Sequence, residues 1–174
     1  MRIFRSFKIT KDYMNSTLAI GNFDGVHEGH QAVINEAKRI SKKNKTKIGV
    51  LTFEPHPKCY FKKEYDFFRL TPFREKFEIL KLHGIDFVIN IKFNEVFLKK
   101  SAMDFIKLHL VEDLKVSSVV TGFDFVFGNK KVGDVKYMNE YVHKTNAFGF
   151  FTVSEVKNKN NHEVSSSVIR KFLR

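Results

Sequence analysis

Short apolar runs rich in β-branched residues alternate along this chain with stretches in which apolar residues recur at helical spacing. The runs lie at residues 17–23, 48–53, 87–91, 116–122 and 148–156. Between the first two runs, Val33, Ile34, Ala37 and Ile40 share one face of a predicted helix. Strands that are joined through helices pair in parallel, with right-handed crossovers. The sequence therefore predicts an α/β fold, a doubly wound parallel sheet with helices covering both faces.

Helix boundary signals agree with this pattern. Thr71 and Pro72 are typical of an N-cap and a first helical position, and Gly84 is placed to end the helix that follows. Ser101, with an acidic residue three positions later, resembles a capping box. A last helix is predicted over residues 166–173, after a surface turn at 158–162. A mobile lid is expected around residues 58–69.

A turn with two histidines, residues 21–30, follows the first apolar run and leads into an amphipathic segment that begins near Gln31. Its glycines allow backbone N–H groups to approach a ligand closely, and a helix N-terminus carries a partial positive charge. His27 and His30 are three residues apart across the helix entry, so both rings can face one ligand. This combination predicts a phosphate site.

Three other segments also follow predicted strands or open a helix. Residues 53–57 form a loop that two prolines stiffen around His56. Residues 122–128 combine aromatic rings with the carboxylate of Asp124. Residues 164–170 place three serines at a helix start, with Arg170 one turn in, which is a second cradle for an anion. In a doubly wound sheet, binding sites lie beyond the carboxyl ends of the strands, where the histidine turn also falls.

Taken together, these segments resemble the nucleotidyltransferase superfamily, and within it the FMN adenylyltransferase (FAD synthetase) module of the prokaryotic bifunctional riboflavin kinase/FAD synthetases. That family reads G-N-F-D-G-V-H-x-G-H-Q, T-F-x-P-H-P, T-x-x-x-E-K, G-x-D-F-x-F-G followed by G-D, and S-S-T-x-I-R. The counterparts here are residues 21–31, 52–57, 71–76, 122–128 with 133–134, and 165–170. Ser167 stands where the family usually has threonine, and it keeps the hydroxyl. The resemblance implies a Rossmann-like nucleotidyltransferase fold.

The resemblance also implies a reaction, transfer of AMP from ATP to FMN, giving FAD and pyrophosphate. The FMN phosphate would attack the α-phosphorus of ATP in line, and because it is already anionic near neutral pH it needs no strong base. His27 and His30 are expected to act as cationic clamps, since nearby phosphates favour the imidazolium form. Arg170 is expected to grip phosphate oxygens. Mg²⁺ is expected on phosphate oxygens and water, without dedicated protein ligands.

The same resemblance assigns the binding residues. Those expected at ATP, besides the catalytic His27, His30 and Arg170, are Gly21, Phe23, Asp24, Gly25, Gly29, Ser165, Ser166 and Ser167. Those expected at FMN are Asn22, Phe53, Pro55, His56, Pro57, Asp124 and Phe125. Asp124 is expected to form a hydrogen bond rather than to bind metal. For Asp24 two roles stay open, pinning its turn through backbone hydrogen bonds or direct contact with substrate or metal.

Length, composition and absent motifs bear on the number of domains, the compartment and disulfide bonding. The 174 residues and the 43% hydrophobic content suit one domain, residues 1–174. No run approaches the roughly 20 apolar residues of a membrane span, and no signal peptide is recognised, so a cytoplasmic monomer without a membrane partner is expected. Cys59 cannot form an intramolecular disulfide and is predicted to pack. The G-x-P-T-A-N motif of the riboflavin kinase domain is missing, so that domain is expected to be absent.

Three alternatives compete with the FMN adenylyltransferase interpretation. A net charge of +12 suits a partner with phosphates, but the charge is scattered, so a nucleic-acid-binding module is the less favoured hypothesis. A zinc site of His27, His30, His56 and Cys59 has ligand-like spacing, yet it accounts for none of the surrounding glycines. Another nucleotidyltransferase of the superfamily is the enzyme alternative, and the Pro-His-Pro loop argues against it.

Overall fold

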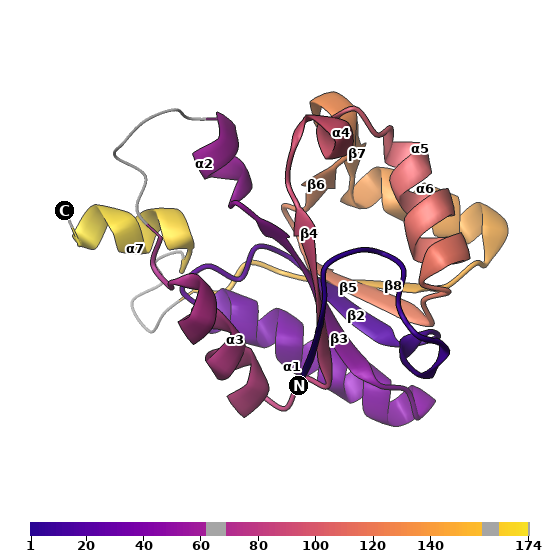
Figure 1. Ribbon diagram of the computed structural model, residues 1–174, viewed down its shortest axis with the longest axis horizontal. Helices are drawn as coiled ribbons and strands as arrows, with labels where there is room; N and C mark the ends of the chain where they lie inside the picture. The colour runs from indigo at the N-terminus through magenta and orange to yellow at the C-terminus, as the bar shows by residue number, and fades with distance from the viewer. Residues whose placement is uncertain (62–68, 158–163, 174) are drawn as a thin grey trace.

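The computed structural model describes residues 1–61, 69–157 and 164–173. A parallel sheet of six strands runs through the molecule, with helices on both of its faces (Figure 1). The strands are β1 (Arg2–Phe4), β2 (Thr17–Ile20), β3 (Ile48–Glu54), β4 (Phe87–Lys92), β5 (Ser118–Gly122) and β8 (Gly149–Val153), and their order is β1-β4-β3-β2-β5-β8. The predicted doubly wound α/β fold is confirmed.

Helices alternate with the strands, as the sequence predicts. They are α1 (Glu28–Asn44), α2 (Pro57–Phe61), α3 (Phe73–Leu82), α4 (Glu95–Leu98), α5 (Ala102–Asp104), the π-helix η2 (Phe105–Asp113), α6 (Val135–Thr145) and α7 (Ser166–Phe172). Of these, α2, α4 and α6 were not predicted. Two 3₁₀ turns, η1 (Lys11–Tyr13) and η3 (Asn129–Lys131), and the antiparallel hairpin β6 (Val126–Phe127) with β7 (Gly133–Asp134) complete the described elements. In the described part of the chain, no helix is long and apolar enough to cross a membrane.

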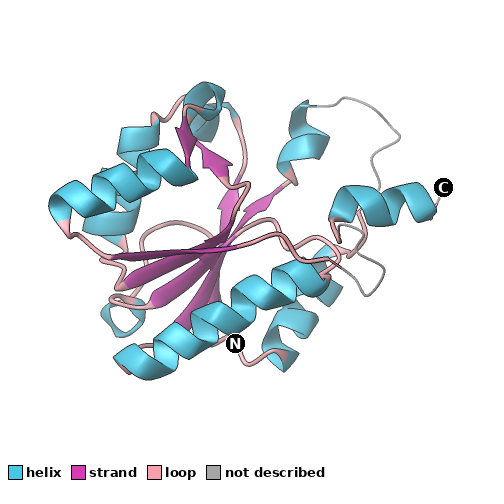
Figure 2. Cartoon of the chain, turned by 180° about the vertical axis from the view of Figure 1, so that it is seen from behind, coloured by secondary structure: helices cyan, strands magenta, loops and turns pink. Residues whose placement is uncertain are grey.

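Alternation along the strands divides the core into two layers. On β2, Leu18 and Ile20 belong to one buried cluster, whereas Ala19, between them, belongs to the other. Helices α1 and α3 cover the second cluster, and η2 and α6 cover the first, so the two pairs lie on opposite faces of the sheet (Figure 2). Burial on both faces accounts for the continuous apolar runs of the sequence.

The strand order reverses at β2, and this reversal places the site. From β2 the chain continues to β3 and β4 on one side, and then returns to β5 and β8 on the other side. Loops at the carboxyl ends of β2 and β5 therefore leave the sheet side by side, which is where ligands bind in doubly wound sheets. The histidine turn follows β2, and the aromatic loop of residues 122–128 follows β5.

Several boundaries differ from the sequence-based expectation. Helix α1 begins at Glu28 rather than near Gln31, so His30 lies inside its first turn. Thr71 does not cap α3, because Pro72 occupies that position and the Thr71 hydroxyl bonds elsewhere. The capping box at Ser101 is confirmed, but the helix continues as a π-helix. The predicted turn at 158–162 and most of the predicted lid at 58–69 lie outside the described residues.

Candidate active site

The histidine turn connects β2 directly to the start of α1. The N–H of Gly21 still donates to the Leu51 carbonyl of β3, so the turn leaves the sheet from a fixed point. Gly25 has a φ of +85°, which favours glycine, and its N–H donates to the Thr71 hydroxyl at 2.7 Å. His27 then occupies the N-cap of α1, although its side chain makes no capping hydrogen bond. The N-terminal backbone N–H groups of α1 are thus presented at the end of the turn.

The two histidines lie against each other, as their spacing predicts. The ring centroids of His27 and His30 are 3.8 Å apart, with the planes at 24°. Gly29 makes this approach possible, because a Cβ at that position would lie 3.1 Å from Cε1 of His27 and 3.3 Å from the Val164 carbonyl oxygen. The buried Nδ1 atom of each ring has no hydrogen-bond partner among the described residues. Two imidazoles with unsatisfied nitrogens therefore stand together at a helix start.

The histidines are neutral in the protein itself. Burial lowers the pKa of His30 to about 3, and the charges of His27, Lys76 and His56 contribute to the shift. Burial also lowers the pKa of His27, although the carboxylates of Asp24 and Asp124 oppose the shift. The cationic form that the sequence argument assigns to these rings therefore depends on an anion beside them, because a nearby negative charge raises a histidine pKa.

Asp24 is the centre of the site's packing. It is 4% exposed, and its Oδ1 accepts hydrogen bonds from the backbone N–H groups of Leu70 and Thr71, both at 3.0 Å. Its Oδ2 pairs with Arg170, and its carbonyl oxygen accepts a bond from the Ser166 hydroxyl at 2.7 Å. Of the two roles left open for Asp24, the structure shows the anchoring one. One carboxylate joins the histidine turn, the segment before α3, and α7.

Arg170 is buried and contacts the protein rather than facing solvent. It is 6% exposed; its Nη2 bonds to Asp24, and its Nη1 donates to the Ser166 carbonyl oxygen at 3.2 Å. The resemblance places this guanidinium on phosphate oxygens, which stays a prediction; in the structure two of its nitrogens bond to Ser166 and Asp24. Its described interactions fix α7 against the histidine turn.

The three serines at the start of α7 make different contacts. Ser165 is the N-cap, and its hydroxyl accepts from the N–H of Val168 at 3.3 Å. Ser166 bonds to the Asp24 carbonyl, as described above, and the Ser167 hydroxyl accepts from Nζ of Lys58 at 2.9 Å. Lys58 belongs to α2, so this bond connects α2 with α7. The serine segment at the start of α7, the second predicted anion site, thus lies beside the histidine turn, the first predicted site.

Phe23, expected at ATP, has its side chain in the core. It is 1% exposed and packs in the α1-side cluster, with its ring centroid 5.3 Å from that of His30. Any contact of Phe23 with a nucleotide would therefore be made by its backbone. The ring packs against the His30 imidazole in a tilted arrangement.

The Pro-His-Pro loop follows β3. The Glu54–Pro55 peptide bond is cis, and Pro57 begins α2. His56 is buried, its Nδ1 accepts from the N–H of Lys58 at 3.0 Å, and burial is the main cause that lowers its pKa to about 4. Phe53 packs on Phe97, with centroids 5.3 Å apart. The charges of Asp24 and Arg170 both act on His56, so this loop borders the Asp24 cluster.

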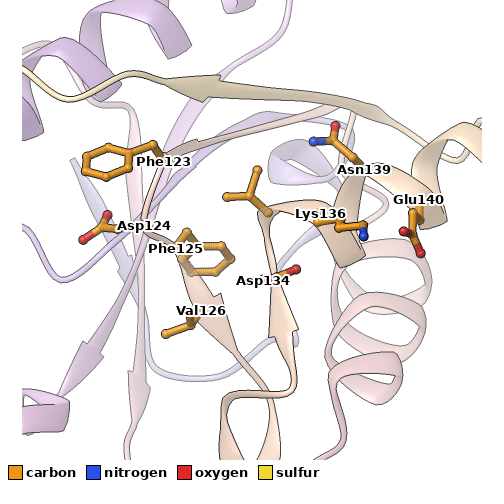
Figure 3. Close-up of a pocket in the computed structure, with 9 residues that line it drawn as sticks. Phe123, Asp124, Phe125, Val126, Asp134, Lys136, Asn139 and Glu140 are labelled. Atoms are coloured by element: carbon orange, nitrogen blue, oxygen red, sulfur yellow. The ribbon is translucent and has the colours of Figure 1, made fainter.

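The loop after β5 borders an open cavity of about 620 Å³ (Figure 3). Phe125 stacks on Phe127 with centroids 5.3 Å apart, whereas Asp124 and Phe123 are exposed. Asp124 is close enough to His27 to influence its pKa, so the loop lies near the histidine turn. The opposite wall was not foreseen from the sequence; it comes from the start of α6 and consists of Asp134, Val135, Lys136, Asn139 and Glu140.

Lys76 is a further residue that the sequence argument did not assign. It lies in α3 and is buried, and its Nζ contacts the Asn22 carbonyl oxygen at 3.4 Å and the Thr52 hydroxyl at 3.3 Å. Asn22, expected at FMN, has a buried side-chain oxygen without a partner in the described residues. The sequence feature that could have pointed to Lys76 is its place as the lysine of the T-x-x-x-E-K segment, next to Phe77, which is buried.

In the described ranges, no group of three or more histidine, cysteine, aspartate or glutamate side chains is arranged to hold a metal ion. Magnesium prefers oxygen ligands and keeps several waters when it accompanies nucleotide phosphates.

The lowered histidine pKa values predict acid sensitivity. Because His30 and His56 titrate at about 3 and about 4 in the folded protein, against a reference of roughly 6.5, the unfolded chain binds more protons between these values. Stability is thus expected to fall as the pH drops from about 6.5 to 4, by up to about 1.4 kcal/mol per pH unit for each ring. Urea unfolding against pH measures this slope, which His30→Asn should reduce. An unchanged slope in that variant would contradict the assignment.

Comparisons with known proteins agree on one family. A family model described as FAD synthetase matches residues 9–168. The bifunctional riboflavin kinase/FMN adenylyltransferase of Buchnera aphidicola (Schizaphis graminum) is 36% identical over 99% of this chain and 55% of its own length. That of Bacillus subtilis is 34% identical over 95% and 51%. The FAD synthetase of Listeria monocytogenes is 33% identical over 94% and 65%.

A solved structure, described as a macrolide-efflux protein from Streptococcus pneumoniae, superposes with a TM-score of 0.82 at 24% identity. It covers 97% of this chain and 54% of the other, and at that identity it supports the fold alone. The chain spans about half the length of the bifunctional relatives reported above.

Proposed function

Because the chain belongs to the FAD synthetase family, we propose that it transfers the AMP group of ATP to FMN, giving FAD and pyrophosphate. The observation that carries the proposal is the Asp24 cluster. It draws together the histidine turn, residues 70–71 and the serine-arginine helix α7, which lie far apart in the sequence. A helix start favours binding of phosphate, and here the start of α1 meets the start of α7 with its serine hydroxyls.

In the proposed reaction an oxygen of the FMN phosphate forms a bond to the α-phosphorus of ATP. The bond from that phosphorus to the bridging oxygen breaks, and pyrophosphate leaves with its electron pair. His27 and His30 become imidazolium when the phosphates of ATP lie beside them, and they then stabilise the charge that develops on the phosphoryl oxygens. Arg170 is proposed to contact phosphate oxygens in this step, and its bonds to Asp24 and Ser166 hold α7 beside the histidine turn. Ser165 to Ser167 and the turn glycines are proposed to line the ATP side.

The flavin side is proposed to lie between the Pro-His-Pro loop and the loop after β5. Phe53 lies near the end of β3, Pro55 and His56 follow this strand, and Pro57 begins α2. Asp124 and Phe125 come from the loop after β5. Asn22 stands between the two loops after the end of β2, and its side-chain oxygen, which has no hydrogen-bond partner among the described residues, can accept a hydrogen bond. Mg²⁺ is proposed to be carried by ATP, where it would neutralise charge on the phosphates. A cytoplasmic location and a monomeric state stay predictions.

Incubation of the purified chain with FMN, ATP and Mg²⁺, with FAD followed by chromatography, tests the proposal directly. FAD and pyrophosphate are expected in equal amounts. If FMN yields no FAD while nicotinate mononucleotide or phosphopantetheine yields pyrophosphate, another transferase of the superfamily is correct. If no acceptor reacts and the chain binds nucleic acid with a steep salt dependence, the protein is a binding module.

A further inference from the structure

Lys76 places an ammonium group in the protein interior. It is 6% exposed, and none of the carboxylates of the described residues forms an ion pair with it. Its two hydrogen bonds, to the Asn22 carbonyl and the Thr52 hydroxyl, are long at 3.4 and 3.3 Å. Burial is the main cause that lowers the pKa of this ammonium. Glu54 and Asp24 attract this ammonium, but neither is an ion-pair partner at close range. A buried charge without a close ion pair destabilises the folded state, so its presence calls for a reason beyond packing.

The ammonium lies at the ends of two central strands. Asn22 directly follows the histidine-turn glycine at the end of β2, and Thr52 lies near the end of β3. The Thr52 hydroxyl also donates to the Asn22 carbonyl oxygen, at 3.2 Å, so three groups converge on one point. On β4, Asn90 stands opposite Thr52 in the strand register, and its buried side-chain oxygen has no partner in the described ranges. The sheet is thus polar where α3 meets the histidine turn.

The charge of Lys76 also acts on the histidines. It is among the causes that lower the pKa of His30 and of His56. The other charged or titratable groups acting on these two rings are His27, Asp24, Arg170 and Lys58, and those acting on Lys76 itself are Glu54, Arg69 and Asp24. A cation at this depth therefore adds positive potential at the turn where phosphates are proposed to bind.

We propose that Lys76 is a positioning residue for AMP transfer: its ammonium holds the Asn22 carbonyl at the end of β2 and thereby fixes the turn that carries His27 and His30. The proposal rests on the proposed function, because the aligned groups are those that act on the α-phosphate. Misplacement of such groups by about 1 Å can lower a rate roughly 10²-fold.

Lys76→Met separates this role from a structural one, because methionine keeps the length of the side chain and removes its charge. Asn22 and Thr52 keep their mutual hydrogen bond in this variant, so its melting temperature should equal or exceed that of the wild type. The kcat for FAD formation is expected to fall about 10- to 100-fold, with KM for ATP changed less than about threefold. Lys81→Met, on the exposed side of α3, is the matched control and should leave both values unchanged.

A histidine titration by NMR gives a readout that does not depend on turnover. In Lys76→Met the His30 resonance is expected to titrate at a higher pH than in the wild type, because a nearby positive charge has been removed. A kcat within twofold of the wild type would overturn the proposal. A lower kcat that is accompanied by a lower melting temperature would also overturn it, since that combination marks a purely structural residue.

Thr52→Val tests the same contact from its other side if Lys76→Met does not fold. Loss of the hydroxyl should lower kcat, and Thr52→Ser, which keeps the hydroxyl, should restore it; wild-type kcat in Thr52→Val would count against the proposal. Failure of the proposed function is distinguishable, because the wild-type chain itself would then form no FAD.

Discussion

Replacement of Asp24 by asparagine is expected to lower the free energy of unfolding by about 3 to 5 kcal/mol, the cost of breaking a buried ion pair by changing one member. Asparagine preserves an oxygen for the N–H groups of Leu70 and Thr71, so the loss reports on the pairing with Arg170. Urea unfolding measures the effect. FAD formation should fall with it, because α7 loses its charged attachment to the histidine turn.

Glu36→Gln is the matched control for Asp24→Asn. It also replaces a carboxylate by an amide in an ion pair with arginine, but the Glu36–Arg39 pair lies on the surface of α1. Exposed pairs contribute about 0 to 1 kcal/mol, so this variant should be nearly as stable as the wild type. In the double variant Asp24→Asn/Arg170→Met, the loss should be smaller than the sum of the single losses. Additive losses would show that the two side chains do not depend on each other.

Replacement of His30 by alanine is expected to lower kcat about 10²- to 10³-fold while FMN still binds within about threefold of the wild-type affinity. The ring stands in the first turn of α1 beside His27, where the phosphates of ATP are proposed to lie. An assay of the rate of FAD formation measures kcat, and FMN fluorescence titration measures FMN affinity.

The control for His30→Ala is His143→Ala, which removes an exposed histidine from α6 and should leave both quantities unchanged. Equal losses of rate and FMN affinity in His30→Ala would refute the assignment of this ring to the ATP side. Arg170→Ala is less informative for this question. Its burial against Asp24 means that a lower rate would include a loss of stability.

The sequence predicts the fold well because burial on both faces of a parallel sheet produces continuous apolar strands and amphipathic helices. β1 was missed because it is short and largely exposed, and α6 was missed because Met138 is its only buried residue. The histidine turn, the Pro-His-Pro loop and the serine helix were predictable because each is contiguous in the chain. Their mutual approach follows from the strand order.

The contacts that hold the site together were not predictable in the same way. The pairing of Asp24 with Arg170 joins residues 146 positions apart, and no local pattern reports such a contact. Lys76 looks like an ordinary helical lysine, because its burial depends on how α3 lies on the sheet. The neutral state of His30 likewise depends on burial, which the spacing of the two histidines does not reveal.

The attachment of α7 to Asp24 also has a consequence for how the protein is made. At about 5 to 20 residues per second, synthesis of the chain between Asp24 and Arg170 takes roughly 7 to 30 seconds. During that interval the central strands and α1 can already pack, while the carboxylate of Asp24 has not yet met its guanidinium. Packing of the central strands and attachment of α7 to Asp24 are thus expected to occur one after the other, with the attachment of α7 last.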